Sequence, residues 1–162
     1  MTNYGGALLA SGQVDAAVET YREALQLRRS QGEPYLTLDS LAGLAEAALA
    51  AGDAAQAQDC VDEILSYLAH HAPEGTDDAF QIYLTCVEVL HANDDERAAP
   101  LLAEAMQRLQ AQAAALNTPE QQRAFLNDIA THRTLLRLAQ SKSSPEIEDN
   151  SDSGDIFTLA EA

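Results

Sequence analysis

A set of small residues recurs three times along this chain at a nearly constant spacing. Each copy begins at a turn-forming residue, continues with an Ala five residues later, and ends seven residues after that Ala. The copies are Gly12, Ala17 and Ala24, then Gly52, Ala57 and Ile64, then Asn93, Ala98 and Ala105, and they begin 40 and 41 residues apart. A period of this length is typical of stacked helical hairpins. We therefore predict an all-α protein in which antiparallel helical hairpins stack as a short α-solenoid.

Turn residues divide the first two thirds of the chain into three hairpins. Gly ends a helix by adopting a left-handed conformation, and Asn93 is expected to replace it at the third turn. The breaks lie at Gly12, Gly32, Gly52 and Asn93. We predict hairpins over residues 2–31, 34–71 and 77–116. Their helices are expected over 2–12, 14–31, 34–51, 54–71 and 95–116, with one more that begins at Asp77 or Asp78 and ends near Ala92.

The C-terminal part of the chain changes character twice. Thr118, Pro119 and Gln121 predict a strong helix start, because Thr caps, Pro suits the first position and Gln closes a capping box. Capping helices are expected over 119–141, with a bend near 128–131, and they complete a repeat domain over residues 1–141. Beyond it, residues 142–162 hold too few apolar side chains to offset the entropy of ordering. We predict a disordered acidic tail there.

The net charge of the chain limits the classes of partner that it can bind. It carries 26 acidic and 9 basic residues, for a formal net charge of -17. Such a protein repels phosphate backbones and anionic lipid surfaces, so no nucleic acid and no membrane is expected as a partner. A basic partner is favoured, although the acidity could serve solubility alone. No transmembrane stretch and no signal peptide is recognisable, so we expect a cytoplasmic protein.

Patterns of known catalytic and metal sites are missing from the sequence. It has no P-loop, no HExxH and no Cys/His cluster. Adjacent His70 and His71 would point about 100° apart on a helix and cannot share a metal by themselves. Cys60 and Cys86 fall on apolar helix faces and are expected as packed free thiols. We expect no enzymatic activity, no cofactor and no metal.

The repeating positions carry a family resemblance. They are Gly5, Leu8, Gly12, Ala17, Tyr21 and Ala24 in the first copy, Ala45, Ala48, Gly52, Ala57, Val61 and Ile64 in the second, and Cys86, Val89, Asn93, Ala98, Leu102 and Ala105 in the third. This pattern resembles the tetratricopeptide repeat over residues 2–110, in which small residues let two helices meet. The family's common period is about 34 residues. The longer period here resembles the C-terminal repeats of large bacterial regulators built around a signal-transduction ATPase.

The resemblance implies that the first helix of each hairpin lines a concave binding face. By the repeat register, the inward positions are Thr2, Gly6, Leu9, Asp39, Ala42, Glu46, Leu49, Phe80, Tyr83, Val87 and His91. They lack the Lys and Asn with which some family members clamp a terminal carboxylate, so that role is not expected. The face is apolar with acidic spots and suits an apolar or basic amphipathic segment. The alternative is that these residues pack against neighbouring repeats.

The resemblance further implies a protein–protein interaction scaffold or sensor module. We expect it to be the C-terminal repeat part of a bacterial signalling ATPase or transcriptional regulator, and the short first helix leads us to expect an array that begins upstream of Met1. The alternative is a stand-alone acidic adaptor or secretion-type chaperone. Under both hypotheses the partner is a protein or peptide, and the repeat ends offer a route to a homo-oligomer.

Overall fold

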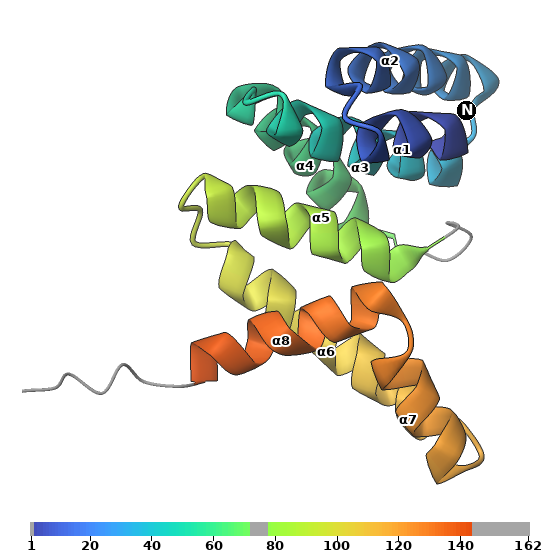
Figure 1. The fold of residues 1–162 in the computed structure, drawn as a ribbon, viewed down its shortest axis with the longest axis vertical. Coiled ribbons are helices and arrows are strands. Elements are labelled where there is room, and N and C mark those ends of the chain that lie inside the picture. The colour runs from blue at the N-terminus through green and yellow to red at the C-terminus, as the bar shows by residue number, and fades with distance from the viewer. Residues whose placement is uncertain (1, 72–77, 144–162) are drawn as a thin grey trace, which may run out of the picture.

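The computed structural model describes residues 2–71 and 78–143, and over these ranges every regular element is a helix. Figure 1 shows the helices stacked as hairpins along the long axis of the molecule. They are α1 (Thr2–Ala10), α2 (Val14–Gln31), α3 (Pro34–Ala50), α4 (Ala54–Leu68), α5 (Ala79–Ala92), α6 (Ala98–Ala114), α7 (Pro119–Asn127) and α8 (Ala130–Ser143). The predicted all-α fold of stacked antiparallel hairpins is confirmed.

A left-handed residue closes each of the three hairpins. Gly12 and Gly52 have φ angles of 79° and 80°, which Gly adopts without a steric penalty. At the third turn the prediction is wrong by one residue, because Asn93 has a φ of -100° and Asp94 has a φ of 52°. The side-chain amide of Asn93 instead donates to Oε1 of Gln58 at 2.7 Å. Asn93 therefore serves the contact with α4, and the next residue makes the turn.

The helix ends lie within three residues of their predicted positions. α1, α4 and α6 are two or three residues shorter at an end than predicted. Before α6, the N–H of Arg97 donates to Oδ1 of Asp95 at 2.9 Å, so this carboxylate caps a separate turn that delays the helix. The capping box of Thr118 and Gln121 is present at the start of α7, as predicted. The bend predicted near residues 128–131 is also present, because α7 ends at Asn127 and α8 begins at Ala130.

Two predicted segments fall largely outside the described residues. The connection at 72–77 is one of them. The other is the tail predicted over 142–162: α8 continues to Ser143, and the remainder of the tail lies outside the described residues.

Small residues allow α1, α2 and α3 to pack closely. Tyr21 of α2 lies between the other two helices. A Cβ atom added to Gly43 would lie 2.1 Å from the ring of Tyr21, and one added to Gly5 would lie 2.7 Å from it. Ala17 and Ala57 are fully buried at the corresponding contacts within the first two hairpins. The small residues thus bring the helices together until Tyr21 fills the space that remains.

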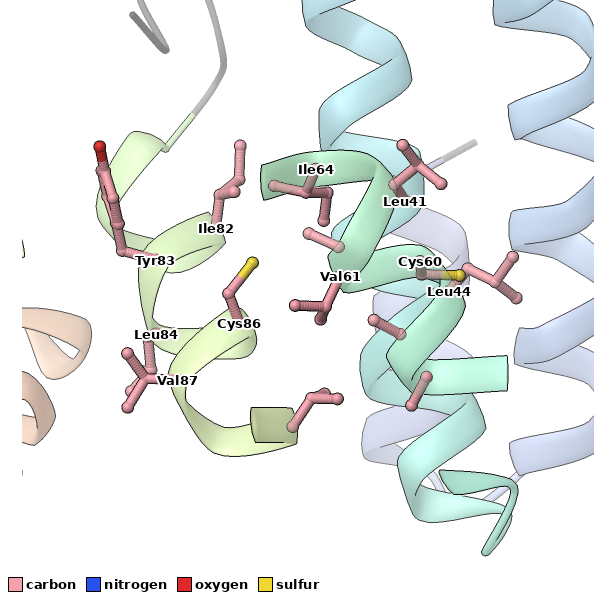
Figure 2. Close-up of a cluster of buried hydrophobic side chains, with 14 of the residues drawn as sticks. Leu41, Leu44, Cys60, Val61, Ile64, Ile82, Tyr83, Leu84, Cys86 and Val87 are labelled. Carbon is pink, nitrogen blue, oxygen red and sulfur yellow. The ribbon is translucent and has the colours of Figure 1, made fainter. Parts of the chain in front are cut away.

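α5 is buried on two opposite sides. Figure 2 shows Ile82 and Cys86 pointing toward Val61 and Ile64 of α4, whereas Val87 points away from them. The helix packs against α3 and α4 on the first side and against α6 and α8 on the second. Most side chains of α5 therefore belong to the core.

α8 occupies the place of the first helix of a further hairpin. It contacts α5 and α6, much as α5 contacts α3 and α4. The hydroxyl of Thr131 donates to Oε1 of Gln81 at 2.8 Å, and Leu135 is fully buried. α7 has nine residues, none of them buried, and connects α6 to α8. The C-terminal helices therefore cover the end of the stack, as a capping role requires.

Candidate functional site

The helices α3 and α5 leave few side chains accessible. Apart from residues at the helix ends, these lie in one strip on each helix, at spacings of seven and three residues that place them on one side. We define the inner face as this strip together with Leu9 of α1. Its members are Leu9, Asp39, Glu46, Leu49, Gln81, Glu88 and His91.

Hydrogen bonds in the turns fix which positions of the three hairpins are equivalent. In each turn the backbone N–H that follows the left-handed residue donates to a carbonyl five residues earlier. The pairs are Gln13 with Leu8 at 2.9 Å, Asp53 with Ala48 at 2.9 Å, and Asp95 with Leu90 at 2.8 Å. His91 is therefore equivalent to Leu9 and Leu49. Three residues earlier, Glu88 is equivalent to Glu46.

Three residues predicted for the concave face lie in the core instead. Phe80, Tyr83 and Val87 are only 6%, 1% and 0% exposed. The hydroxyl of Tyr83 donates to Oε1 of Glu104 on α6 at 3.1 Å. Phe80 packs against His132 of α8, with 4.8 Å between the ring centroids. These side chains hold α5 against α6 and α8 and do not line an open face.

The reason for this error is the position of the third turn. The prediction placed the turn residue at Asn93, whereas the structure places it at Asp94. A shift of one residue rotates a position by about 100° around a helix. In the corrected register, Gln81 replaces Phe80 and Glu88 replaces Val87; both are accessible, and the sequence analysis missed them. The position of Tyr83 passes to Leu84, which is buried like its equivalent Ala42 on α3, so this position faces the core in both hairpins.

The other predicted positions divide into accessible and buried residues. Leu9, Asp39, Glu46, Leu49 and His91 are half-exposed or exposed and belong to the inner face. Three further positions do not. Ala42 is buried in α3, Gly6 is a half-buried glycine of α1, and the side chain of Thr2 lies outside the described part of the chain.

Charged groups from four helices influence one another along the inner face. Burial raises the pKa of Glu46 above its ordinary value. Burial also raises the pKa of Glu88; the charge of Glu46 adds to this effect, and Arg137 of α8 opposes it. The pKa of Tyr21 is raised by burial and then by Glu46. Electrostatic coupling therefore runs from α2 through α3 and α5 to α8.

This arrangement is suited to binding a cation beside apolar groups. Neighbouring carboxylates repel each other when both are charged, and a Lys or Arg side chain placed against Glu46 and Glu88 would relieve that repulsion. Leu9 and Leu49 are half-exposed and pack against the core from the same strip. They supply apolar area that a bound segment can cover.

The described residues offer little for covalent or metal chemistry. Cys60 and Cys86 are free and buried, as predicted, and burial raises their pKa values to about 11 and about 12. Such thiols stay protonated at neutral pH and are poor nucleophiles. Over residues 2–71 and 78–143, no group of three or more His, Cys, Asp or Glu side chains is placed to hold a metal ion. In the same ranges no helix has the length and apolar character needed to cross a membrane.

Comparison with known proteins agrees with the repeat pattern. The sequence model of the tetratricopeptide repeat family matches residues 1–69, which include α1 to α4. The family resemblance that the small residues predicted over residues 2–110 is thereby confirmed for the part up to residue 69. Comparisons with curated proteins and with solved structures gave no significant match. Tetratricopeptide repeats generally mediate protein–protein interaction and are a non-catalytic fold.

Proposed function

We propose that the protein binds a segment of a partner protein across the inner face, on the premise that residues 1–69 match the sequence model of the tetratricopeptide repeat family. The observation that carries the proposal is the placement of Glu46 and Glu88. Both are accessible carboxylates at equivalent positions, and each is the one accessible residue in its stretch of buried residues, 40–48 of α3 and 82–90 of α5. Their raised pKa values mean that the fold disfavours their charges. A cationic group of a partner would offset this cost, so we assign the two carboxylates to binding.

The partner segment is basic and amphipathic. Its apolar side chains cover Leu9 and Leu49, and its Lys or Arg side chains contact Asp39, Glu46 and Glu88. Added salt should weaken such a complex, because part of the attraction acts between solvent-exposed charges. Nucleic acid and membrane surfaces carry the wrong charge for this face.

The proposal includes a cellular context. We assign the protein to the C-terminal repeat part of a cytoplasmic bacterial signalling ATPase or transcriptional regulator, and the 40-residue period supports this. The alternative is a stand-alone acidic adaptor or secretion-type chaperone. The neighbouring genes separate the two: an adjacent reading frame for an ATPase with repeats favours the first, and a secretion effector favours the second.

A capture experiment with matched variants tests the proposal. The inner-face variant carries Glu46→Lys and Glu88→Lys. The control variant carries Glu19→Lys and Glu23→Lys, which make the same charge change at exposed positions of α2. Quantitative mass spectrometry of captured proteins should find a partner that the wild type and the control retain and the inner-face variant loses. Equal capture by both variants would remove the inner face from consideration.

A second copy of this chain is an alternative partner, in contact through the repeat ends. Size-exclusion chromatography with light scattering decides this. A mass that stays monomeric as concentration rises excludes the homo-oligomer, and a concentration-dependent dimer that the inner-face variant still forms would support it.

A further inference from the structure

The inner face continues from α5 onto α8. Thr131 of α8 donates to Gln81 of α5 at 2.8 Å, and Arg137 acts on Glu88 of α5. On α5, Glu88 follows Gln81 by seven residues, and on α8 Arg137 follows Thr131 by six, so the two contacts occur in the same order along both helices. The two helices therefore run side by side in the same direction, as Figure 1 also shows. One side of α8 thus extends the accessible strip of α5.

A pocket opens on this side of α8, and its charge is opposite to that of the inner face. The pocket has a volume of about 450 Å³. It is lined by Asn127, Arg133, Thr134, Leu136, Arg137 and Gln140, among others. We call it the α8 pocket. The charged residues in its lining are both arginines, and Arg137 belongs both to the pocket and to the surroundings of Glu88.

The two arginines have different roles in the pocket. The guanidinium of Arg133 donates to the backbone carbonyls of Asn127 and Asp128 at 2.9 and 3.2 Å. Arg133 is therefore held in place by the C-terminal end of α7. Arg137 lies one helical turn later and is exposed. A guanidinium in this setting can bind a carboxylate in a bidentate manner.

We propose that the partner segment is bipolar, with a basic side chain against Glu46 and Glu88 and an acidic side chain in the α8 pocket. The proposal rests on the proposed function, because it describes the same bound segment. The observation behind it is the reversal of charge along one continuous surface, from two carboxylates on α3 and α5 to two arginines on α8. A uniformly basic segment would place one of its charges against Arg133 and Arg137, where like charges repel.

The fold also sets the spacing of the two charges. Packed helices lie about 8–10 Å apart, and an extended chain advances about 3.3 Å per residue. A segment that runs from between α3 and α5 to α8 crosses about one and a half helix spacings, so its basic and acidic side chains should lie about three to five residues apart.

Selection of peptides against the intact protein tests this inference. The probe is a phage-displayed library of random dodecapeptides. It is selected against the wild type, against Arg137→Glu and against Arg123→Glu, which makes the same charge change at an exposed position of α7 outside the lining of the α8 pocket. The wild type and Arg123→Glu should both enrich peptides with a base and an acid three to five residues apart. Arg137→Glu should select peptides that lack the acid or replace it with a base.

Synthetic peptides then provide a charge-swap measurement. In a selected peptide, replacing the acidic residue by Lys should weaken binding to the wild type by about three- to tenfold, and Arg137→Glu should restore it. Circular dichroism melting of Arg137→Glu checks that the variant folds. If it does not fold, Arg137→Gln replaces it, and this variant should bind the peptide with the acid and the peptide with Lys equally well.

The outcomes separate this inference from the proposed function. Selected peptides that are basic only, or a selection that Arg137→Glu does not change, would overturn the bipolar segment and leave inner-face binding intact. Enrichment of no peptide, or of peptides whose binding is insensitive to Glu46→Lys, would overturn both.

Discussion

The first two hairpins, α1 to α4, and the C-terminal helices α5 to α8 are packed by different kinds of residues. In the first region helices meet at Gly5, Gly43 and Ala17, which leave room for Tyr21. In the second region buried small residues recur between α5 and α6, at Ala98 and Ala105, whereas α7 and α8 pack through large side chains. In one such contact Phe125 packs against His132 with 4.5 Å between ring centroids. The family match covers residues 1–69, the region built on small residues.

This difference shows what each kind of packing specifies. A contact between small residues fixes a close distance and a definite face of each helix, and it therefore repeats as a recognisable pattern. A contact between large side chains can be met by several combinations of residues of similar volume. α7 and α8 can thus continue the stack without the small-residue pattern.

The largest expected effect tests whether the C-terminal helices belong to one folding unit with the hairpins. Leu135 of α8 is fully buried, so Leu135→Ala should destabilise by about 2–5 kcal/mol through lost burial and a cavity. Thermal melting followed by circular dichroism should show a single transition at a lower temperature. Leu27→Ala, at a position that is 44% exposed, should change stability by less than about 0.5 kcal/mol. Two separate transitions in Leu135→Ala would divide the molecule between α4 and α5.

A smaller effect tests the role of small residues in the first region. Gly43→Ala should destabilise by about 1–3 kcal/mol, because its Cβ would lie 2.1 Å from the buried ring of Tyr21. Gly6→Ala is the matched control on α1, since its Cβ would meet the hydroxyl of Tyr21 at an ordinary 3.5 Å. Ala favours a helix over Gly, so this control should be neutral or stabilising by up to about 1 kcal/mol. Urea denaturation measures both, and equal losses would show that Tyr21 does not set the helix distance.

The turns allow a direct exchange between the two regions. Gly52 has a φ of 80° and Asp94 has a φ of 52° at the equivalent position. Gly52→Ala should cost about 1–2 kcal/mol, because a Cβ disfavours this conformation. Asp94→Gly should stabilise by up to about 1 kcal/mol, an amount reduced by the greater freedom of Gly in the unfolded chain. Urea midpoints of the two variants should move in opposite directions; a shared direction would mean that the third turn relies on the Asp side chain.

Much of the fold could be predicted from the sequence, because its signals are local. α2 has the predicted ends, Val14 and Gln31, since turn residues flank both. The capping box of Thr118 and Gln121 lies within four residues and was predicted as it occurs. The all-α class follows from the repeat period, which needs no knowledge of distant contacts.

The candidate site was harder to predict, because its register depends on distant contacts. Asn93 and Asp94 are neighbours, and both residue types tolerate a left-handed conformation. The choice between them involves the amide of Asn93, which donates to Gln58 of α4. With Asp94 as the left-handed residue, Glu88 takes the position on α5 that Glu46 has on α3. Arg137 could not be placed beside Glu88 either, because the path of the chain between α6 and α8 decides it.

The smallest expected effect crosses the boundary between the two regions, from Glu46 on α3 to Glu88 on α5. The pKa values of both are raised in the folded state, so the folded protein binds protons more tightly than the unfolded chain at these groups. Their contribution to stability is present at low pH and is lost as pH rises through the raised pKa values. Glu88→Gln should therefore melt above the wild type at neutral pH, and the two curves should converge toward about pH 4. Arg137→Gln should melt below the wild type at neutral pH, because Arg137 lowers the pKa of Glu88 and its loss would raise that pKa further. Tyr21 ionises too far above this pH range to contribute. Melting temperatures measured from acid to neutral pH give the answer, and a difference that does not vary with pH would show that the two regions are not coupled through these carboxylates.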